Sequence, residues 1–229
     1  MVTEDKNNRP DYKFYGRLKG VRLSDRQSSL VETLLPKLRV DLDDPLAFSS
    51  GDLWLEIGFG GGEHLAHQAV QNPQTGIIGA EPFINGIAKL LVAVEEHNLT
   101  NVTIHDSDVR TLLPKIPDNS LSQVFLLYPD PWHKQRHRKR RIVNAESVAH
   151  FHRILKPGGL FRFASDIEDY VRWTVSFVDK HGGFDYAGDN LNDWRQAPDD
   201  WRRTRYEKKA IREGRQPSYL TFKTKSLQP

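Results

Sequence analysis

Carboxylate side chains stand at or just beyond the ends of three successive apolar segments in the first half of the chain. They are Glu56, Glu81, and Asp108 with its near neighbour Asp106. A carboxylate at a strand end can accept hydrogen bonds from ribose hydroxyls, which suits Glu81, or from an adenine amino group, which suits Asp108 or Asp106. Asp108 could instead be a helix cap. Acids in three equivalent places predict a nucleoside-binding site.

A glycine-rich turn, EIGFGGG at residues 56–62, follows the first apolar segment. It does not fit the dinucleotide-binding pattern G-x-G-x-x-G, because the last position counted from Gly58 is Glu63. It fits E-x-G-x-G, which is common among enzymes that use S-adenosyl-L-methionine (SAM). SAM carries an ammonium and a sulfonium, so Glu56 suits it better than a bare helix N-terminus, which favours anions. Gly58 and Gly60 are therefore candidate cofactor contacts, and a tight turn with a solvated Glu56 is the alternative.

Asp130 is held between two prolines at the end of the apolar segment 124–128. Each proline fixes its own φ and disfavours helical backbone at the residue before it. Asp130 is therefore expected to be extended and pre-positioned at the edge of the sheet. An ordinary turn aspartate is the alternative, but the restriction on both sides favours a catalytic residue.

Positive charge is concentrated directly after this segment. The nine residues 133–141 contain six Lys or Arg, two His and no acid. Inside a domain and beside a candidate active site, such a run predicts contacts with the phosphates of a polyanion. The candidate phosphate contacts are Arg136, Arg138, Lys139, Arg140 and Arg141. A second basic stretch, residues 192–215, is interleaved with Trp194, Trp201 and Tyr206, which suits an RNA with exposed bases.

Composition narrows the class of protein. The chain has 229 residues, with 33 Lys and Arg against 30 Asp and Glu, a length that suggests one large domain. It has no Cys, which excludes cysteine nucleophiles, thiolate metal sites and disulfides. The sequence has no G-x-S-x-G motif of a serine hydrolase, and no metal site is expected. The polar first residues and the lack of a long apolar stretch predict a cytoplasmic protein without a membrane segment.

Short apolar segments alternate with helical patterns along most of the chain. Strands are expected at 53–57, 76–80, 102–104, 124–128, 160–164 and 218–222, and helices at 84–97, 143–155 and 167–178, after Ser24 and through Leu65. This alternation predicts a Rossmann-like α/β fold with a mostly parallel, twisted sheet, helices on both faces and a late antiparallel C-terminal strand. Residues 1–22 are expected to form a flexible basic and aromatic arm, and 23–229 a single domain. Ligands of such sheets bind beyond the carboxyl ends of the strands.

Several motifs resemble those of the bacterial tRNA (guanine-N(7)-)-methyltransferases. They are LEIGFG at 55–60, GAE at 79–81, IPDNSL at 116–121, YPDPWHK at 128–134, RKRR at 138–141 and TRYE at 204–207. The glycine turn is generic to SAM-dependent enzymes, whereas YPDPWHK and TRYE are much more specific. The resemblance runs through nearly the whole domain.

The resemblance implies a SAM-dependent methyltransferase fold and methyl transfer from SAM to N7 of a guanosine in the variable loop of tRNA. It implies that SAM is bound by Glu56, Glu81, the acid after the third strand and Asp130. It also implies that the guanosine meets Asp130, Lys134, Asp166, Thr204, Arg205, Tyr206 and Glu207. The expected partner is tRNA, and the expected assembly is a monomer or a homodimer.

The chemistry of this reaction agrees with the residues present. N7 of guanine carries a lone pair and no proton, so its methylation needs no general base. The enzyme must align the reacting atoms and stabilise the guanine as it becomes cationic. Asp130 can do both by accepting hydrogen bonds from the ring N–H and the exocyclic amine.

Two other functions remain open from the sequence. An exocyclic-amine methyltransferase would have a second proline in its Asn/Asp-Pro-Pro motif, where Trp132 stands here. A non-catalytic RNA-binding protein would explain the basic run but not Glu56, Glu81 and Asp130 together.

Overall fold

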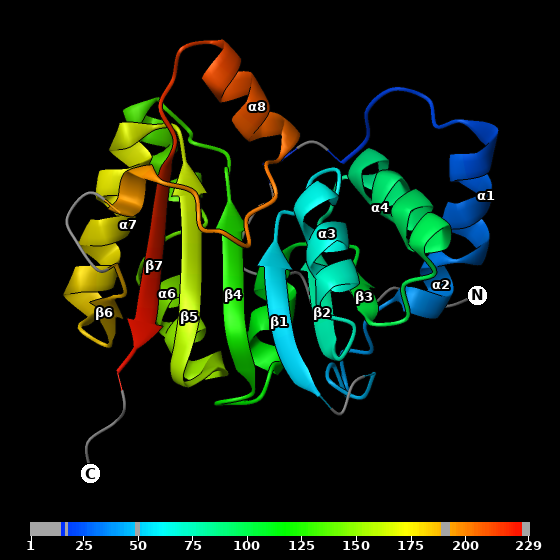
Figure 1. Cartoon of the computed structure of the whole chain (residues 1–229), viewed down its shortest axis with the longest axis horizontal. Coiled ribbons are helices and arrows are strands. Elements are labelled where there is room, and N and C mark those ends of the chain that lie inside the picture. Colours follow the sequence, from blue (N-terminus) through cyan, green and yellow to red (C-terminus); the bar gives the residue numbers. More distant parts are fainter. Residues whose placement is uncertain (1–14, 17, 49–50, 189–192, 226–229) are drawn as a thin grey trace.

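The computed structural model describes residues 15–16, 18–48, 51–188 and 193–225. Within these residues a seven-stranded sheet has the order β3-β2-β1-β4-β5-β7-β6 (Figure 1). The strands are β1 (Asp52–Ile57), β2 (Thr75–Ala80), β3 (Val102–His105), β4 (Leu121–Leu127), β5 (Leu155–Ser165), β6 (Phe184–Tyr186) and β7 (Ser218–Thr224). β1 to β5 pair in parallel, and β7 is antiparallel to both β5 and β6. The predicted fold class, including the antiparallel C-terminal strand, is confirmed.

The central strands are buried on both faces of the sheet. Every residue of β1 after Asp52 is buried, and β2 is buried throughout. Such unbroken burial is typical of parallel strands that helices cover on both sides. The chain builds the sheet outward in both directions from β1, which pairs with β2 on one side and β4 on the other. Ligands of open α/β sheets bind beyond the strand ends at this switch point.

Two layers of helices cover the sheet. One face packs against α1 (Asp25–Thr33), α3 (Glu63–Gln71) and α4 (Ile84–His97), and the other against α5 (Val109–Leu112), α6 (Ala145–Ile154) and α7 (Glu168–His181). The other described elements are α2 (Leu35–Leu38), η1 (Leu113–Lys115), η2 (Gln135–Arg140), η3 (Asp193–Arg195) and α8 (Arg205–Arg212). In Figure 1, α8 lies above the carboxyl ends of β1 and β4, where the ligand site is expected.

β6 and α8 are among the elements that were not predicted from the sequence. β6 has three residues, of which only Phe184 is buried, so it is too short to show an alternating pattern. α8 buries only Glu207 and Ala210, so it lacks the apolar stripe by which a helix is recognised. Thr204 begins α8, because its side chain accepts a hydrogen bond from the main-chain N–H of Glu207.

The predicted arm, residues 1–22, is described only in part, since residues 1–14 and 17 lie outside the described residues. The main-chain N–H of Ile84 donates to the carbonyl of Leu18 over 3.1 Å. The side chain of Asn85 accepts from the N–H of Gly20 and donates to the carbonyl of Val21. This end of the arm is therefore attached to the start of α4. None of the described helices has the length and apolar character needed to cross a membrane.

Candidate active site

The turn between β1 and α3 carries the predicted cofactor residues Gly58 and Gly60. Their φ angles are 69° and 57°, a conformation that glycine adopts without the steric cost of a Cβ. The N–H of Gly58 donates to the carbonyl of Ala80 over 2.7 Å, which ties the turn to the end of β2. A Cβ on Gly58 would meet no atom within 4 Å, so the turn faces open space.

Glu81, the first residue after β2, holds the same turn with its side chain. Oε2 accepts from the N–H of Gly60 over 2.8 Å, and Oε1 accepts from the N–H of Phe83 over 3.0 Å. Burial raises the pKa of this carboxyl, these two donors lower it, and the neighbouring charges of Asp130 and Arg205 raise and lower it respectively. A carboxylate has about four acceptor positions, so two are left for a ligand such as ribose.

Gly86, in the first turn of α4, is a site residue that the sequence analysis missed. A Cβ at this position would lie 2.1 Å from the carbonyl oxygen of Gly60. The helix can therefore approach the glycine turn only because residue 86 has no side chain. A glycine inside a strong helical pattern, where it costs about 1 kcal/mol relative to alanine, was the available indication.

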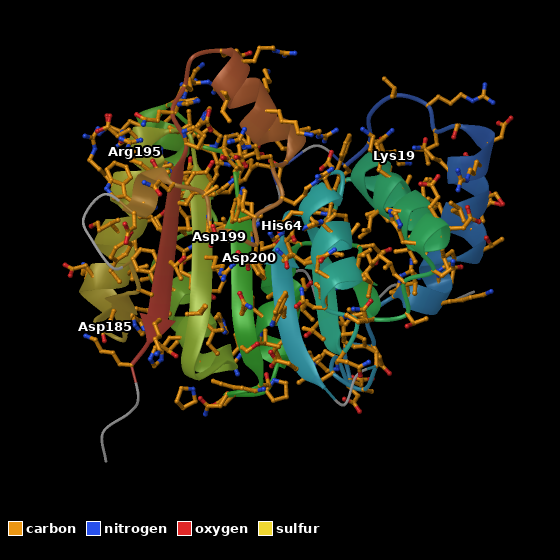
Figure 2. All side chains as sticks on the ribbon, viewed as in Figure 1. Lys19, His64, Asp185, Arg195, Asp199 and Asp200 are labelled. Carbon is orange, nitrogen blue, oxygen red and sulfur yellow. The ribbon has the colours of Figure 1, made fainter. Side chains whose placement is uncertain are left out.

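Glu56 is almost completely buried, and His64 of α3, also missed from the sequence, contacts its carboxylate. Nδ1 of His64 lies 2.7 Å from Oε2 of Glu56. The amide of Gln68 donates to the other ring nitrogen over 3.3 Å and to the carbonyl of Asp200 over 2.9 Å. His64 and Asp200 are labelled in Figure 2. The ring proton is therefore assigned to Nδ1, from which it donates to Glu56. The Oε1 oxygen of Glu56 is the one left to meet a cationic ligand.

Residues 128–132, here called the Asp130 loop, follow β4 with an unusual backbone. Tyr128 and Trp132 have φ angles of 52° and 43°, which are uncommon for residues other than glycine. Tyr128 was expected to end the strand, but β4 ends one residue earlier because the chain turns there. Two prolines and two left-handed residues together restrict the backbone on both sides of Asp130.

Asp130 is exposed, and its carboxylate has no hydrogen bond or ion pair to any residue that the structure describes. Partial desolvation by its surroundings raises its pKa. Its charge also raises the pKa of Glu81, which means that the two carboxylates lie in the same region. An accessible carboxylate that no described residue binds keeps all its acceptor positions for a ligand.

The start of α8 lies over the glycine turn. A Cβ on Gly60 would be 3.2 Å from Cε2 of Tyr206. Nη2 of Arg205 donates to the hydroxyl of Tyr206 over 3.0 Å, and the charge of Arg205 lowers the pKa of Glu81. The structure thus brings the predicted substrate segment 204–207 against the predicted cofactor residues.

The carboxylate of Glu207 faces the protein interior. It accepts a hydrogen bond from the indole N–H of Trp201 over 2.8 Å and one from the hydroxyl of Tyr219 over 2.7 Å. Its side chain anchors α8 to β7, which differs from the predicted contact with substrate. Trp201 also packs against His64, with ring centroids 5.2 Å apart. Trp201 is therefore half-buried and bonded within the protein.

Asp166, the first residue after β5, contacts the C-terminal segment. Its Oδ2 lies 2.6 Å from Nη1 of Arg215, in the stretch between α8 and β7. This ion pair joins the end of β5 to that stretch. The predicted contact of Asp166 with guanosine would share the carboxylate with this arginine.

Both acids that follow β3 are paired with arginines. Asp108 caps α5, because it accepts from the N–H of Arg110 over 3.0 Å, and it also binds the guanidinium of the same residue. Asp106 pairs with Arg39 over 2.7 Å. The helix cap that the sequence left open for Asp108 is therefore present.

The basic run after the Asp130 loop forms the turn η2 and ends in the interior. Lys134, Arg136 and Lys139 are exposed, and Arg138 and Arg140 are half-buried. Arg138 pairs with Asp169 over 2.8 Å, and the guanidinium carbon of Arg140 lies 4.0 Å from the ring centroid of Tyr15. Arg141 is only 2% exposed. Its guanidinium is enclosed by the protein, which does not favour the predicted contact of Arg141 with phosphates.

Comparison with known proteins gives the family. A family described as "Putative methyltransferase" matches residues 50–219. A tRNA (guanine-N(7)-)-methyltransferase of Agrobacterium fabrum is 49% identical, over 96% of this chain and 99% of its own. That of Roseobacter denitrificans is 50% identical, over 95% of this chain and 98% of its own. This chain belongs to the tRNA (guanine-N(7)-)-methyltransferase family.

A solved structure agrees with the fold of this methyltransferase. The 16S rRNA methyltransferase KamB matches with a TM-score of 0.57 at 16% identity, over 92% of this chain and 99% of its own. At such low identity the likeness concerns the fold alone.

The methyl donor of this methyltransferase is SAM, and the residues present fit it. Gly58 faces open space that a Cβ would enter. Glu81 keeps acceptor positions beyond the two that bind the main chain. The Asp130 carboxylate, without a partner in the described chain, is suited to meet positive charge.

Proposed function

We propose that this methyltransferase modifies N7 of a guanosine in the variable loop of tRNA, and that Asp130 orients the guanine. The observation that carries the proposal is the Asp130 carboxylate, which is accessible, has no partner in the described chain and lies near Glu81. It follows β4, which pairs directly with β1. Asp130 therefore belongs to the same sheet edge as Glu56 and the glycine turn.

Each side chain of the site has a separate task in this proposal. Glu56 and Glu81 bind the cofactor through its ammonium group and its ribose, and the glycine turn lets the main chain come close to it. Bound SAM supplies an electrophilic methyl group on a sulfonium. Asp130 accepts hydrogen bonds from the N1–H and the exocyclic amine of guanine and turns N7 toward that methyl group.

Asp130 also contributes electrostatically. Guanine gains a positive charge as its N7 is methylated, and a fixed carboxylate in a partly dry site stabilises that charge. Its position costs no reorganisation during the reaction, because the loop on both sides is already restricted. No general base is needed, since N7 has no proton to lose.

The tRNA is held by the exposed part of the basic run and by the segment around α8. Lys134, Arg136 and Lys139 are exposed beside the Asp130 loop, where they can contact phosphates without reading sequence. Arg205 and Tyr206 lie over the glycine turn. They are placed to meet the guanosine and the cofactor together.

All these residues come from one chain, so the proposed site is complete in a monomer. We treat residues 23–229 as one catalytic domain, because both helical layers pack on the same sheet. The substrate, tRNA, makes the cytoplasm the proposed location.

The test is to locate the methylated atom and nucleotide. The protein is incubated with bulk tRNA and methyl-labelled SAM, and the tRNA is digested and analysed for 7-methylguanosine. Reduction and aniline cleavage of intact tRNA then give the position. Label in 7-methylguanosine at a variable-loop position supports the proposal. Label in an exocyclic-amine product, or at N7 outside the variable loop, contradicts its chemistry or its position respectively.

A further inference from the structure

Arg141 ends the basic run but does not share its environment. Its side chain is fully enclosed, with 0% exposure, whereas Lys139 two residues earlier is exposed. A buried guanidinium is costly unless its charge is paired and its N–H groups are bonded. Such a cost indicates a specific use for the residue in the fold or the site.

The partners of Arg141 come from the Asp130 loop and from α7. Its Nε donates to the carbonyl oxygen of Pro131 over 2.8 Å, and its Nη2 donates to Oδ2 of Asp169 over 2.5 Å. Its guanidinium carbon lies 4.6 Å from the ring centroid of Tyr170 and 5.0 Å from that of Trp173. The charge is therefore balanced by one carboxylate and two aromatic faces.

These partners are themselves fixed. The indole N–H of Trp173 donates to the carbonyl of Val143 over 2.7 Å, and Tyr170 is completely buried. The Nε bond reaches the residue directly after Asp130, whereas the Asp169 and ring contacts hold the guanidinium on α7. Arg141 thus joins a rigid helix to the Asp130 loop.

We propose that Arg141 is a positioning residue for Asp130 and not a contact to tRNA. This inference rests on the proposed function of Asp130. The main chain of the Asp130 loop is tied at its start by the hydrogen bond from Tyr128 N–H to the carbonyl of Ala164, and at its end by Arg141. The second tie fixes the Pro131 carbonyl next to Trp132, whose φ is 43°. It thereby limits rotation of the segment that carries the Asp130 carboxylate.

A lysine cannot replace this residue. The planar guanidinium donates in two directions at once from Nε and Nη2 and lies flat on aromatic rings, and an ammonium does neither in the same way. Nη1 of Arg141 is also buried and has no hydrogen-bond partner among the described residues. This cost is tolerated because the two other nitrogens hold the loop.

The test compares Arg141→Lys with Lys139→Gln in the full-length protein. Single-turnover methyl transfer is measured at saturating SAM and tRNA, together with tRNA affinity as a function of salt. We expect Arg141→Lys to lower the single-turnover rate about 10- to 100-fold, because misplacement of about 1 Å can cost 100-fold. Its tRNA affinity and salt dependence stay as in the wild type. Lys139→Gln weakens tRNA binding and lowers the slope of log affinity against log salt by about 0.7–0.9.

A readout independent of activity accompanies the rates. Hydrogen exchange at the amides of Asp130 and Trp132 is expected to be faster in Arg141→Lys, with exchange in the central strands unchanged. The matched control is Arg172→Lys, the same change at an exposed residue of α7 that pairs with exposed Glu168. It should leave both the rate and the loop exchange unchanged.

Two results overturn the proposal: weaker tRNA binding with a wild-type rate in Arg141→Lys, which makes the residue a contact to tRNA, or no change in rate and loop exchange. If Arg141→Lys does not fold, the same measurements are made on Asp169→Asn. This change is made in an Arg138→Gln background, which removes the other arginine bound to Asp169. Compared with Arg138→Gln alone, a slower rate of methyl transfer with an unchanged salt slope in the double variant supports the proposal. A steeper salt slope with an unchanged rate contradicts it. If Asp130→Asn itself transfers methyl at the wild-type rate, the function proposed for Asp130 fails. This failure is distinguishable from a failure of the inference about Arg141, because Arg141 is unaltered in that variant.

Discussion

Asp130→Asn removes the charge of a carboxylate that is partly desolvated by its surroundings, although the residue is exposed, and that has no partner in the described chain. Asparagine has nearly the same size, so the restricted Asp130 loop can keep its backbone. The change therefore separates two effects of one charge, its cost to the fold and its use in the reaction.

The fold should gain from this change. Because Asp130 is exposed, the gain is limited to about 0.5 kcal/mol, the usual range for a surface substitution. A gain of about 0.5 kcal/mol raises the melting temperature by about 1–2 °C in a chain of this length.

The gain depends on pH in a defined direction. Partial desolvation raises the pKa of Asp130 in the folded protein, so the folded state holds this proton more tightly than the unfolded chain does. The penalty of the ionised form is absent below the ordinary pKa of about 3.9 and complete above the raised folded value. The difference in melting temperature between Asp130→Asn and wild type should therefore be present at neutral pH and shrink toward acid pH.

The reaction should lose much more than the fold gains. Removal of one preorganised electrostatic contact costs about 100- to 1000-fold in turnover, or about 2.7–4 kcal/mol of transition-state stabilisation. The asparagine amide also presents a donor to the N–H groups of guanine. The loss should appear in methyl transfer at saturating tRNA and SAM, while tRNA affinity is maintained by the basic residues.

The assays are single-turnover methyl transfer and thermal unfolding at neutral and acid pH, on wild type and Asp130→Asn in parallel. Transfer at close to the wild-type rate would show that Asp130 is an ordinary turn residue. A lower melting temperature at neutral pH would show that the wild-type carboxylate has stabilising partners, and would refute the argument from partial desolvation.

Three further changes test other parts of the site. Glu81→Gln should weaken the binding of SAM roughly 10- to 150-fold in calorimetry, since each lost charge-assisted hydrogen bond is worth about 1.5–3 kcal/mol. An unchanged affinity for SAM would exclude Glu81 from the cofactor site. Glu207→Gln should leave an amide donor facing either the indole N–H of Trp201 or the hydroxyl of Tyr219. We expect it to lower the free energy of unfolding by about 1–3 kcal/mol in denaturant. Unchanged unfolding would mean that this cluster does not anchor α8. Gly86→Ala should destabilise the protein by about 1–3 kcal/mol despite the better helix propensity of alanine, because its Cβ would lie 2.1 Å from the carbonyl oxygen of Gly60; equal or higher stability would show that α4 can move aside.

The strand ends and the acids that follow them could be predicted from sequence because both depend on local patterns. Unbroken apolar runs indicate buried parallel strands, and the topology then places Glu81 and Asp130 at one edge. The two prolines beside Asp130 predict a restricted backbone, although not the positive φ at Tyr128, which allows the chain to turn away from β4.

The partners of these residues could not be predicted, because they come from distant segments. The sequence around His64 does not indicate that its ring meets Glu56, since the contact requires α3 to pack over β1. Arg141 looks like its basic neighbours in sequence, and only the packing of α7 makes it a buried residue. α8 was missed for a related reason, because its buried face includes the charged side chain of Glu207.

The position of β7 in the sheet has a consequence for the order in which the protein can fold during synthesis. β7 lies between β5 and β6, so β6 leaves the ribosome first but can join the sheet only after β7 has been made. Tyr219, which holds Glu207 and therefore α8, is also on β7. Folding of a growing chain proceeds from the N-terminal part. The basic run beside Asp130 is therefore exposed to RNA before α8, which covers the site, can be anchored. A nascent chain that stops before residue 218 would thus carry the residues that bind phosphate without the anchored α8 that completes the site.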